Sequence, residues 1–93
     1  MKTKVLISKK VVKEIERVPL YISKKLYDWV AQVQIYGIYT IRMVPGFHDE
    51  PLKGSRSGQR SIRLNKAYRA IYLEKEDENV VLITILEVNK HEY

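Results

Sequence analysis

The residues with the clearest chemical potential in this chain lie between positions 48 and 69. This segment has six basic and two acidic residues, a net charge of +4, and so carries most of the +6 of the 93-residue chain. Guanidinium groups bind phosphate through two parallel, directional hydrogen bonds, whereas a lysine ammonium acts as a compact point charge. The segment therefore predicts an anion site. Its basic residues are Lys53, Arg56, Arg60, Arg63, Lys66 and Arg69.

The alternation of apolar and polar residues assigns a direction to two of these arginines. Ile62 and Leu64 share one face of a predicted strand over 61–64, which turns Arg63 away from the core. Arg69 lies on the next predicted strand, and neighbouring antiparallel strands are about 5 Å apart. The two guanidinium groups could therefore reach one phosphate. The alternative is that the arginines are solvated or pair with the acidic residues at 74, 76 and 77.

Imidazole, carboxylate and phenol groups flank the basic segment. His48, Asp49 and Glu50 begin it, and His91 and Tyr93 follow the last predicted strand. Histidine transfers protons near neutral pH and tyrosine can donate a proton or stack on a base, but chain ends can also be plain polar tails. A metal site is disfavoured, because adjacent residues of an extended segment point in opposite directions and the chain has no HExxH motif. No phosphate-binding loop is present either. We expect no metal and no cofactor.

Hydrophobic periodicity predicts the elements that would position these groups. A β-prone stretch at 4–7 precedes a helix capped by Ser8, and a second helix runs from Leu20 to a stop at Gly37. All four glycines fall between 37 and 58, which predicts an irregular segment. Three strands follow, at 61–64, 67–74 and 80–88. The last is nearly continuous in apolar residues, which is typical of a strand buried on both faces. The predicted class is α+β: one strand, a two-helix hairpin and a three-stranded antiparallel meander.

Length and composition limit the class of protein. A chain of 93 residues with 45% hydrophobic content fits one globular domain over residues 1–93. The absence of cysteine excludes disulfide frameworks, thiolate metal sites and cysteine nucleophiles. The longest apolar run, 80–86, is too short to cross a bilayer, and the first residues lack the apolar region of a signal peptide. We therefore expect a cytoplasmic protein with no membrane partner.

The order of several short motifs resembles one family of bacterial toxins. The chain contains Glu50-Pro51-Leu52-Lys53-Gly54, then Ser57-Gly58-x-x-Ser61-x-Arg63, then Tyr68-Arg69-Ala70-x-Tyr72, and finally His91 and Tyr93. This ordered set is similar to the type II toxins of the RelE/YoeB/HigB superfamily, and with the preceding strand and hairpin the likeness covers nearly the whole chain. It implies a RelE/ParE-like, microbial-ribonuclease-like fold. It also implies metal-independent endoribonuclease activity on mRNA in the decoding site of the 30S ribosomal subunit, and a cognate antitoxin protein.

The resemblance also implies roles for individual residues. Glu50 matches an acidic residue proposed as general base, and Arg63 matches a strand arginine at the scissile phosphate. Lys53 matches a basic residue that engages RNA phosphate. His91 and Tyr93 match a terminal His–Tyr pair that is adjacent in the family, whereas one residue separates the two here.

Other residues of the basic segment extend this implied site. His48 resembles a loop histidine of HigB-type toxins and is a second candidate for the base. Arg60 and Arg69 fit the basic wall of the superfamily's active site, and Arg56 joins the RNA-binding group through the charge of its segment. In the implied reaction, the 2′-hydroxyl of the RNA attacks the adjacent phosphate. Whether His91 or Tyr93 would be the acid stays open.

Two other functions compete with the nuclease. A ParE-like member of the same superfold would inhibit DNA gyrase through protein contacts without cutting RNA. A plain RNA-binding module would use the basic strands and the tyrosines as a stacking platform. Only the nuclease has a chemical need for proton-transfer groups beside cations.

Overall fold

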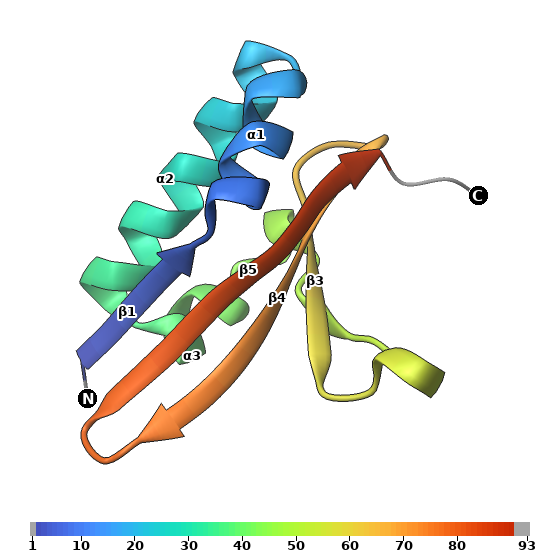
Figure 1. Cartoon of the computed structure of the whole chain (residues 1–93). Coiled ribbons are helices and arrows are strands. Elements are labelled where there is room, and N and C mark those ends of the chain that lie inside the picture. The colour runs from blue at the N-terminus through green and yellow to red at the C-terminus, as the bar shows by residue number, and fades with distance from the viewer. Residues whose placement is uncertain (1, 91–93) are drawn as a thin grey trace.

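The computed structural model of the chain describes residues 2–90. A strand and two helices come first, and a short third helix leads into the remaining strands (Figure 1). The helices are α1 (Lys9–Arg17), α2 (Leu20–Tyr36) and α3 (Ile38–Arg42), with 3₁₀ turns η1 (Pro45–Phe47) and η2 (Gly54–Arg56). The strands are β1 (Lys2–Ile7), β2 (Glu50–Pro51), β3 (Gln59–Arg63), β4 (Tyr68–Asp77) and β5 (Val80–Lys90).

The five strands form one sheet in the order β1-β5-β4-β3-β2. β1 runs parallel to β5, and every other neighbouring pair is antiparallel. Strands β3, β4 and β5 are the predicted meander, and β1 joins it at the edge formed by β5. The predicted α+β class and order of elements are confirmed.

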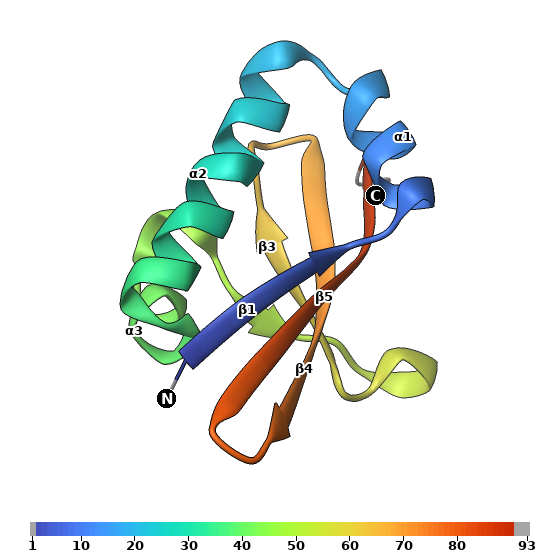
Figure 2. The ribbon, with the colours of Figure 1, turned by 60° about the vertical axis from the view of Figure 1, so that its left-hand side comes forward.

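Local sequence explains where the helical hairpin begins and ends (Figure 2). The side chain of Ser8 accepts a hydrogen bond from the amide of Val11 at 3.3 Å, which caps α1 as predicted. Gly37 ends α2 with a φ of 88°, a conformation that glycine adopts without the steric penalty of a Cβ atom. Its amide donates to the carbonyl of Val33 at 2.8 Å.

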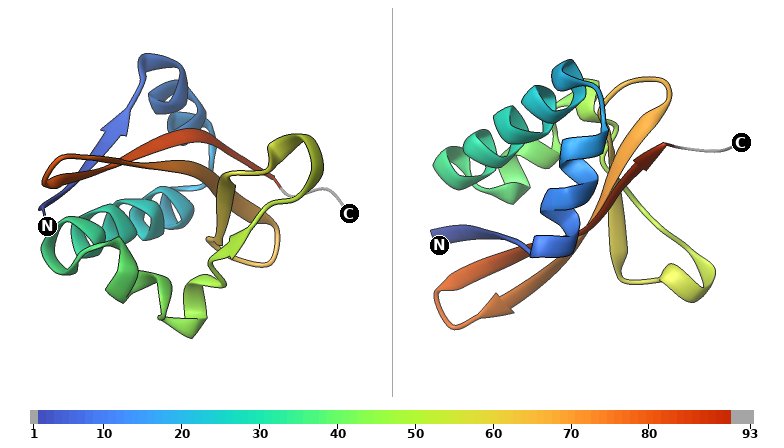
Figure 3. Two further views of the ribbon diagram at one scale, coloured as in Figure 1. Left: turned by 90° about the horizontal axis from the view of Figure 1, so that it is seen from below. Right: turned by 45° about the horizontal axis from the view of Figure 1, so that its top comes forward.

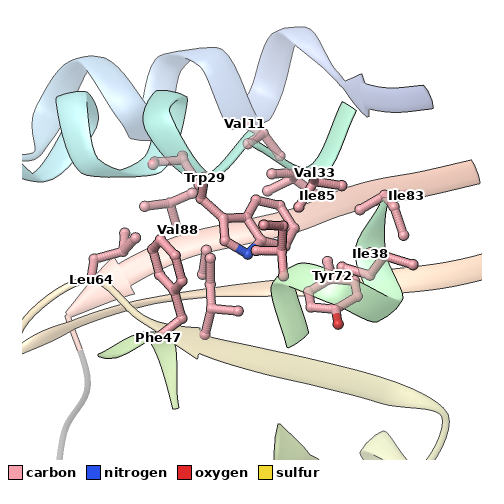
Figure 4. Close-up of a cluster of buried hydrophobic side chains, with 14 of the residues drawn as sticks. Val11, Trp29, Val33, Ile38, Phe47, Leu64, Tyr72, Ile83, Ile85 and Val88 are labelled. Carbon is pink, nitrogen blue, oxygen red and sulfur yellow. The ribbon is translucent and has the colours of Figure 1, made fainter. Parts of the chain in front are cut away.

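The hydrophobic core lies between the hairpin and the sheet. Trp29 of α2 is fully buried against Tyr72 of β4, with the ring centroids 5.3 Å apart. Figure 4 shows Phe47 at one end of this cluster and Ile38 and Ile83 at the other. Large aromatic side chains contribute much of the apolar surface buried in a small core. The packing of Trp29 on Tyr72 therefore sets the position of β4 relative to α2.

The two faces of the sheet differ in character. Ile62, Ala70 and Tyr72 point into the core, on what we call the inner face. Side chains that alternate with them, such as Arg63 and Arg69, lie on the opposite side, the outer face. No α-helix covers this face within residues 2–90. The chain between β2 and β3, which includes η2, projects away from the helices (Figures 1 and 3).

The segment between α2 and β3 is more regular than its glycines suggest. It contains α3, whose Ile38 and Ile41 are buried in the core. The prediction of a wholly irregular segment is wrong, because two isoleucines at helical spacing gain burial by adding one more turn of helix.

The ends and burial of the last two strands also differ from expectation. β4 continues to Asp77, so the polar turn is shorter than predicted, and Glu78 takes a positive φ of 54° within it. β5 buries Val81 and Ile83 on the inner face, while the intervening residues are only partly buried. The prediction of a strand buried on both faces is therefore wrong.

No helix within residues 2–90 combines the length and the apolarity needed to span a bilayer.

Candidate functional site

A pocket of about 200 Å³ opens on the outer face of the sheet. Its walls come from the segment that leads into β2, from β3, from the turn after β3 and from the start of β4. It brings together four of the nine predicted site residues, from three separate stretches of chain. The lining includes His48, Glu50, Ser61, Arg63, Tyr68 and Arg69.

Arg63 and Arg69 face each other directly across β3 and β4. Arg63 is exposed and Arg69 is partly buried, and the Nε of Arg69 has no hydrogen-bond partner within residues 2–90. Neither arginine forms a salt bridge with the described part of the chain. Side chains of directly opposite residues start about 5 Å apart, so two guanidinium groups are close enough for one phosphate.

The turn between these strands keeps the two arginines opposite each other. The side-chain oxygen of Asn65 accepts hydrogen bonds from the amides of Ala67 and Tyr68, both at 2.7 Å. This arrangement is an Asx turn, in which a short side chain replaces a backbone acceptor. The predicted turn at Asn65 is confirmed, and it fixes the register of the arginine pair.

Two of the three acids proposed as alternative partners of the arginines, Glu74 and Glu76, bind elsewhere. Glu74 forms an ion pair with Arg42 of α3, and both Glu74 and Glu76 accept hydrogen bonds from the hydroxyl of Tyr39. The pKa of Tyr39 rises to about 12, because hydrogen bonds to the carboxylates of Glu76 and Glu74 stabilise its protonated form. These acids are therefore already occupied by α3 and do not neutralise the pocket.

Alternation along the segment before β2 decides which side chains reach the pocket. Phe47 is buried in the core, His48 is exposed, Asp49 has a side chain with 0% exposure, and Glu50 is exposed. His48 adopts a left-handed conformation, with φ of 45°. Glu50 then pairs with Ser61 of β3. His48 and Glu50 line the pocket, whereas Asp49 between them points inward. Asp49 and Glu50 therefore point in opposite directions, as expected of adjacent residues in an extended segment.

Arg60 lies on the inner face, away from the pocket. It stands opposite Tyr72 in the β3–β4 ladder, and its Nε donates to Oδ1 of Asp49 at 2.6 Å. The hydroxyl of Tyr72 donates to the other oxygen of the same carboxylate, also at 2.6 Å. The structure thus places Arg60 in a buried polar cluster and not beside Arg63.

Arg56 and Lys53 also lie outside the pocket. Arg56 forms two contacts with the carboxylate of Glu87, at 3.1 and 3.2 Å, and its Nε donates to Gln59 at 2.9 Å. The ion pair ties η2 to β5 across the outer face. Lys53 is exposed in the short connection between β2 and η2.

Two polar residues of β5 belong to the surroundings of the site although sequence reasoning missed them. Asn89 stands opposite Arg69, and Glu87 stands opposite Ile71, so both lie on the outer face. The hydrogen bond from Arg56 lowers the pKa of Glu87, with smaller contributions from Asn89 and from the charge of Arg69. No local signal marked Glu87, because the register shift between Ile71 and Tyr72 changes the face on which the end of β5 places its side chains.

The predicted residues His91 and Tyr93 lie outside the described residues. The last described residue, Lys90, pairs with Tyr68, which lines the pocket, so β5 ends beside the site. Within residues 2–90 no group of three or more histidine, aspartate or glutamate side chains could hold a metal ion.

Comparisons with known proteins place this fold. No protein-family model and no curated protein matches the sequence. Among solved structures, the YoeB/ParE toxin from Agrobacterium tumefaciens has a TM-score of 0.70 at 18% identity, over 99% of this chain and 100% of that one. A chain of the RelBE2 toxin–antitoxin complex from Mycobacterium tuberculosis has a TM-score of 0.67 at 16% identity, over 98% of this chain and 100% of that one. A chain of the YoeB–YefM complex from Staphylococcus aureus has a TM-score of 0.67 at 19% identity, over 99% of this chain and 100% of that one. The chain therefore has, over nearly its whole length, the fold of the YoeB and RelE toxins.

Proposed function

We propose that the protein is the toxin of a type II toxin–antitoxin system and cleaves ribosome-bound mRNA as a metal-independent endoribonuclease. The observation that carries the proposal is the meeting of Arg63 and Arg69 with His48 and Glu50 in one pocket. Cleavage of RNA by its own hydroxyl needs cations at the phosphorus and a proton acceptor at the attacking oxygen. This pocket holds both kinds of group. Fold alone does not determine function, but the toxin fold supports the same proposal.

In the proposed reaction the 2′-hydroxyl oxygen of one nucleotide attacks the phosphorus that follows it. The bond between O2′ and phosphorus forms while the bond between phosphorus and O5′ breaks. The proton of the 2′-hydroxyl passes to the base, Glu50 or His48, and a general acid gives a proton to O5′. The products are a 2′,3′-cyclic phosphate and a free 5′-hydroxyl, so the reaction needs neither water nor an external reductant or oxidant.

Arg63 and Arg69 stabilise the negative charge that builds on the phosphorane oxygens. A preorganised donor of this kind contributes about 10²–10³-fold to the rate. Lys53, exposed next to β2, contacts a neighbouring phosphate of the RNA and not the reacting one. The general acid remains the predicted His91 or Tyr93.

The proposed partner is an antitoxin that covers the pocket. Two of the similar structures described above come from toxin–antitoxin complexes. An acidic segment of such a partner would complement Arg63 and Arg69, which form no salt bridge within residues 2–90, in the way that opposite potentials select partners at other interfaces.

Mapping of transcript 5′ ends after induction of the protein in bacterial cells tests this function. We expect new ends with a 5′-hydroxyl, inside codons and in phase with the reading frame. An Arg63→Ala variant should lower the yield of these ends at least 10²-fold, because it removes a charge stabiliser. Arg17→Ala is the matched control, since Arg17 is an exposed arginine of α1 that does not line the pocket.

Intact messages at toxic levels of protein would contradict the proposal. If DNA supercoiling by gyrase were inhibited in the same cells, the ParE-like function would replace it. Cleavage by Arg63→Ala at the wild-type rate would instead remove the assignment of this arginine.

A further inference from the structure

We propose that Asp49 is a positioning residue whose buried carboxylate, held by Arg60 and Tyr72, fixes His48 and Glu50 in the pocket. Its catalytic consequence rests on the proposed function, whereas the structural part does not. Asp49 does not line the pocket, and neither do the side chains that contact its carboxylate, so it can act only through its neighbours in the chain.

Three side chains from three different elements surround the carboxylate. Its Oδ1 accepts from Nε of Arg60 at 2.6 Å, and its Oδ2 accepts from the hydroxyl of Tyr72 at 2.6 Å. Nε of Arg42 lies 3.9 Å from Oδ1 and has no hydrogen-bond partner within residues 2–90. With 0% of its side chain exposed, Asp49 is the most deeply buried charged group in any of the salt bridges among residues 2–90.

The surrounding core makes these contacts rigid. Tyr72 is fully buried against Trp29, and Figure 4 shows its hydroxyl oxygen pointing away from α1 and α2. Burial and the hydrogen bond to Asp49 both raise the pKa of Tyr72, so the hydroxyl keeps its proton and remains a donor. Arg42 is held in turn by Tyr72 at 3.2 Å and by Glu74. A charge held between fixed partners restrains the backbone that carries it.

Asp49 lies directly between the two candidate bases in the sequence. The backbone on its His48 side has a left-handed φ of 45°, and on its Glu50 side it enters the two-residue strand β2. Such a short strand has few ladder hydrogen bonds of its own. Asp49 has the one buried side chain among residues 48–50, so loss of its carboxylate contacts would let both candidate bases move relative to Arg63.

The same geometry gives Arg60 a role different from the predicted contact with RNA phosphate. Its guanidinium is engaged by Asp49 on the inner face, while the pocket opens on the outer face. As a positioning residue, Arg60 should affect the rate of bond cleavage and not the affinity for RNA.

Single-turnover cleavage of mRNA on programmed ribosomes, at saturating protein, tests this inference. Displacing a reacting group by about 1 Å can slow a reaction about 10²-fold, so we expect that loss for Asp49→Asn and about 10-fold for Arg60→Gln and Tyr72→Phe. Affinity is measured separately, on mRNA with a 2′-deoxy nucleotide at the scissile position, which lacks the nucleophile. We expect the dissociation constant to stay within about twofold of wild type.

Two controls separate positioning from general destabilisation. Tyr39→Phe removes a hydroxyl from the exposed end of the same cluster without touching Asp49, and it should cleave at the wild-type rate. Asp49→Asn combined with Glu50→Gln or His48→Gln, whichever single variant is slower, should be no slower than that single variant. The inference would be overturned if the loss of cleavage rate in the double variant equalled the product of the two single losses. It would also be overturned if Arg60→Gln bound the 2′-deoxy mRNA more weakly than wild type. If Asp49→Asn does not fold, Tyr72→Phe decides, because it retains the packed ring.

Amide hydrogen exchange distinguishes failure of this inference from failure of the proposed function. Even if the wild-type protein cleaves no RNA, Tyr72→Phe should speed exchange at residues 48–50 at least tenfold, with β4 and β5 unchanged. Unchanged exchange at residues 48–50 would overturn the positioning role whatever the activity of the protein.

Discussion

Strand β3 carries two arginines three residues apart that have opposite surroundings. Arg60 points inward, where Asp49 neutralises it at 2.6 Å and Tyr72 shares the same carboxylate. Arg63 points outward, opposite Arg69, and forms no salt bridge within residues 2–90. One guanidinium is thus paired with a buried carboxylate, and the other has no acidic partner within residues 2–90.

The difference shows that the acidic side chains within reach, and not the residue type, determine whether an arginine is paired. A charge count over residues 48–69 weights all six basic residues equally. In the structure, Arg56 and Arg60 are paired with acids and hold loops in place, while Arg63 and Arg69 line a pocket. Neutralised cations stabilise structure, and unpaired adjacent cations indicate a site for an anion.

The largest loss of cleavage rate should follow removal of the proposed base from the outer face. Glu50→Gln or His48→Gln should slow single-turnover cleavage about 10²–10⁴-fold for the residue that is the base. The other variant should lose less than about tenfold, because it only lines the pocket. Rates on programmed ribosomes measure both, and Glu16→Gln, an exposed change on α1, is the control. Wild-type rates for both variants would contradict the assignment of this pocket as the active site.

Removal of one arginine from each face tests whether the arginines of the two faces differ in their effects on stability and on cleavage. Arg69→Gln should lower cleavage about 10²-fold with the free energy of unfolding changed by less than about 1 kcal/mol. Arg60→Gln should lower the free energy of unfolding by about 3 kcal/mol, because it removes the nearer cation of a buried carboxylate and leaves only Arg42, 3.9 Å away. Urea unfolding and cleavage assays on the same preparations measure both quantities. Equal stability losses for the two variants would show that the two faces do not differ as described.

The smallest expected effect concerns the ion pair between η2 and β5. The pKa of Glu87 lies below its ordinary value of 4.5 in the folded protein, chiefly through its hydrogen bond with Arg56. A lowered carboxyl pKa adds stability that is present above the unfolded pKa and is lost as the pH falls through the folded pKa. Glu87→Gln should therefore destabilise the protein by about 0.5–1 kcal/mol at pH 7 and have no effect in acid below that lowered pKa. Urea unfolding at several pH values measures the difference, and a constant difference across that range would contradict the ion pair.

Local sequence signals predicted the elements that depend on neighbouring residues. The cap at Ser8, the stop at Gly37 and the turn at Asn65 each involve partners within four residues, so they can be read from the chain. Helix α3 and strand β2 could not be predicted in this way, because a five-residue helix and a two-residue strand are stable only through the core and the sheet beside them.

The site residues could likewise be predicted where their position depends on neighbouring residues, and not where it depends on distant ones. Strict alternation placed Arg63 outside, and the same alternation contains a signal for Arg60, which is two residues from the buried Ile62. Its partner Asp49 is eleven residues away, and only the register of the sheet brings the two together. Glu87 could not be placed by alternation, because the pairing of β4 with β5 shifts between Ile71 and Tyr72 and moves the following residues of β5 to the other face.

Titration of a nucleoside 3′-monophosphate into the protein, followed through the side-chain Nε–Hε resonances of its arginines, tests whether Arg63 and Arg69 form one anion site. We expect the resonances of Arg63 and Arg69 to shift together with one dissociation constant, and binding to weaken as salt is raised. The resonances of Arg56 and Arg60 should stay in place, because their guanidinium groups are already bound by acids. Separate dissociation constants for Arg63 and Arg69, or a shift confined to Arg60, would contradict a single anion-binding pocket on the outer face of the sheet.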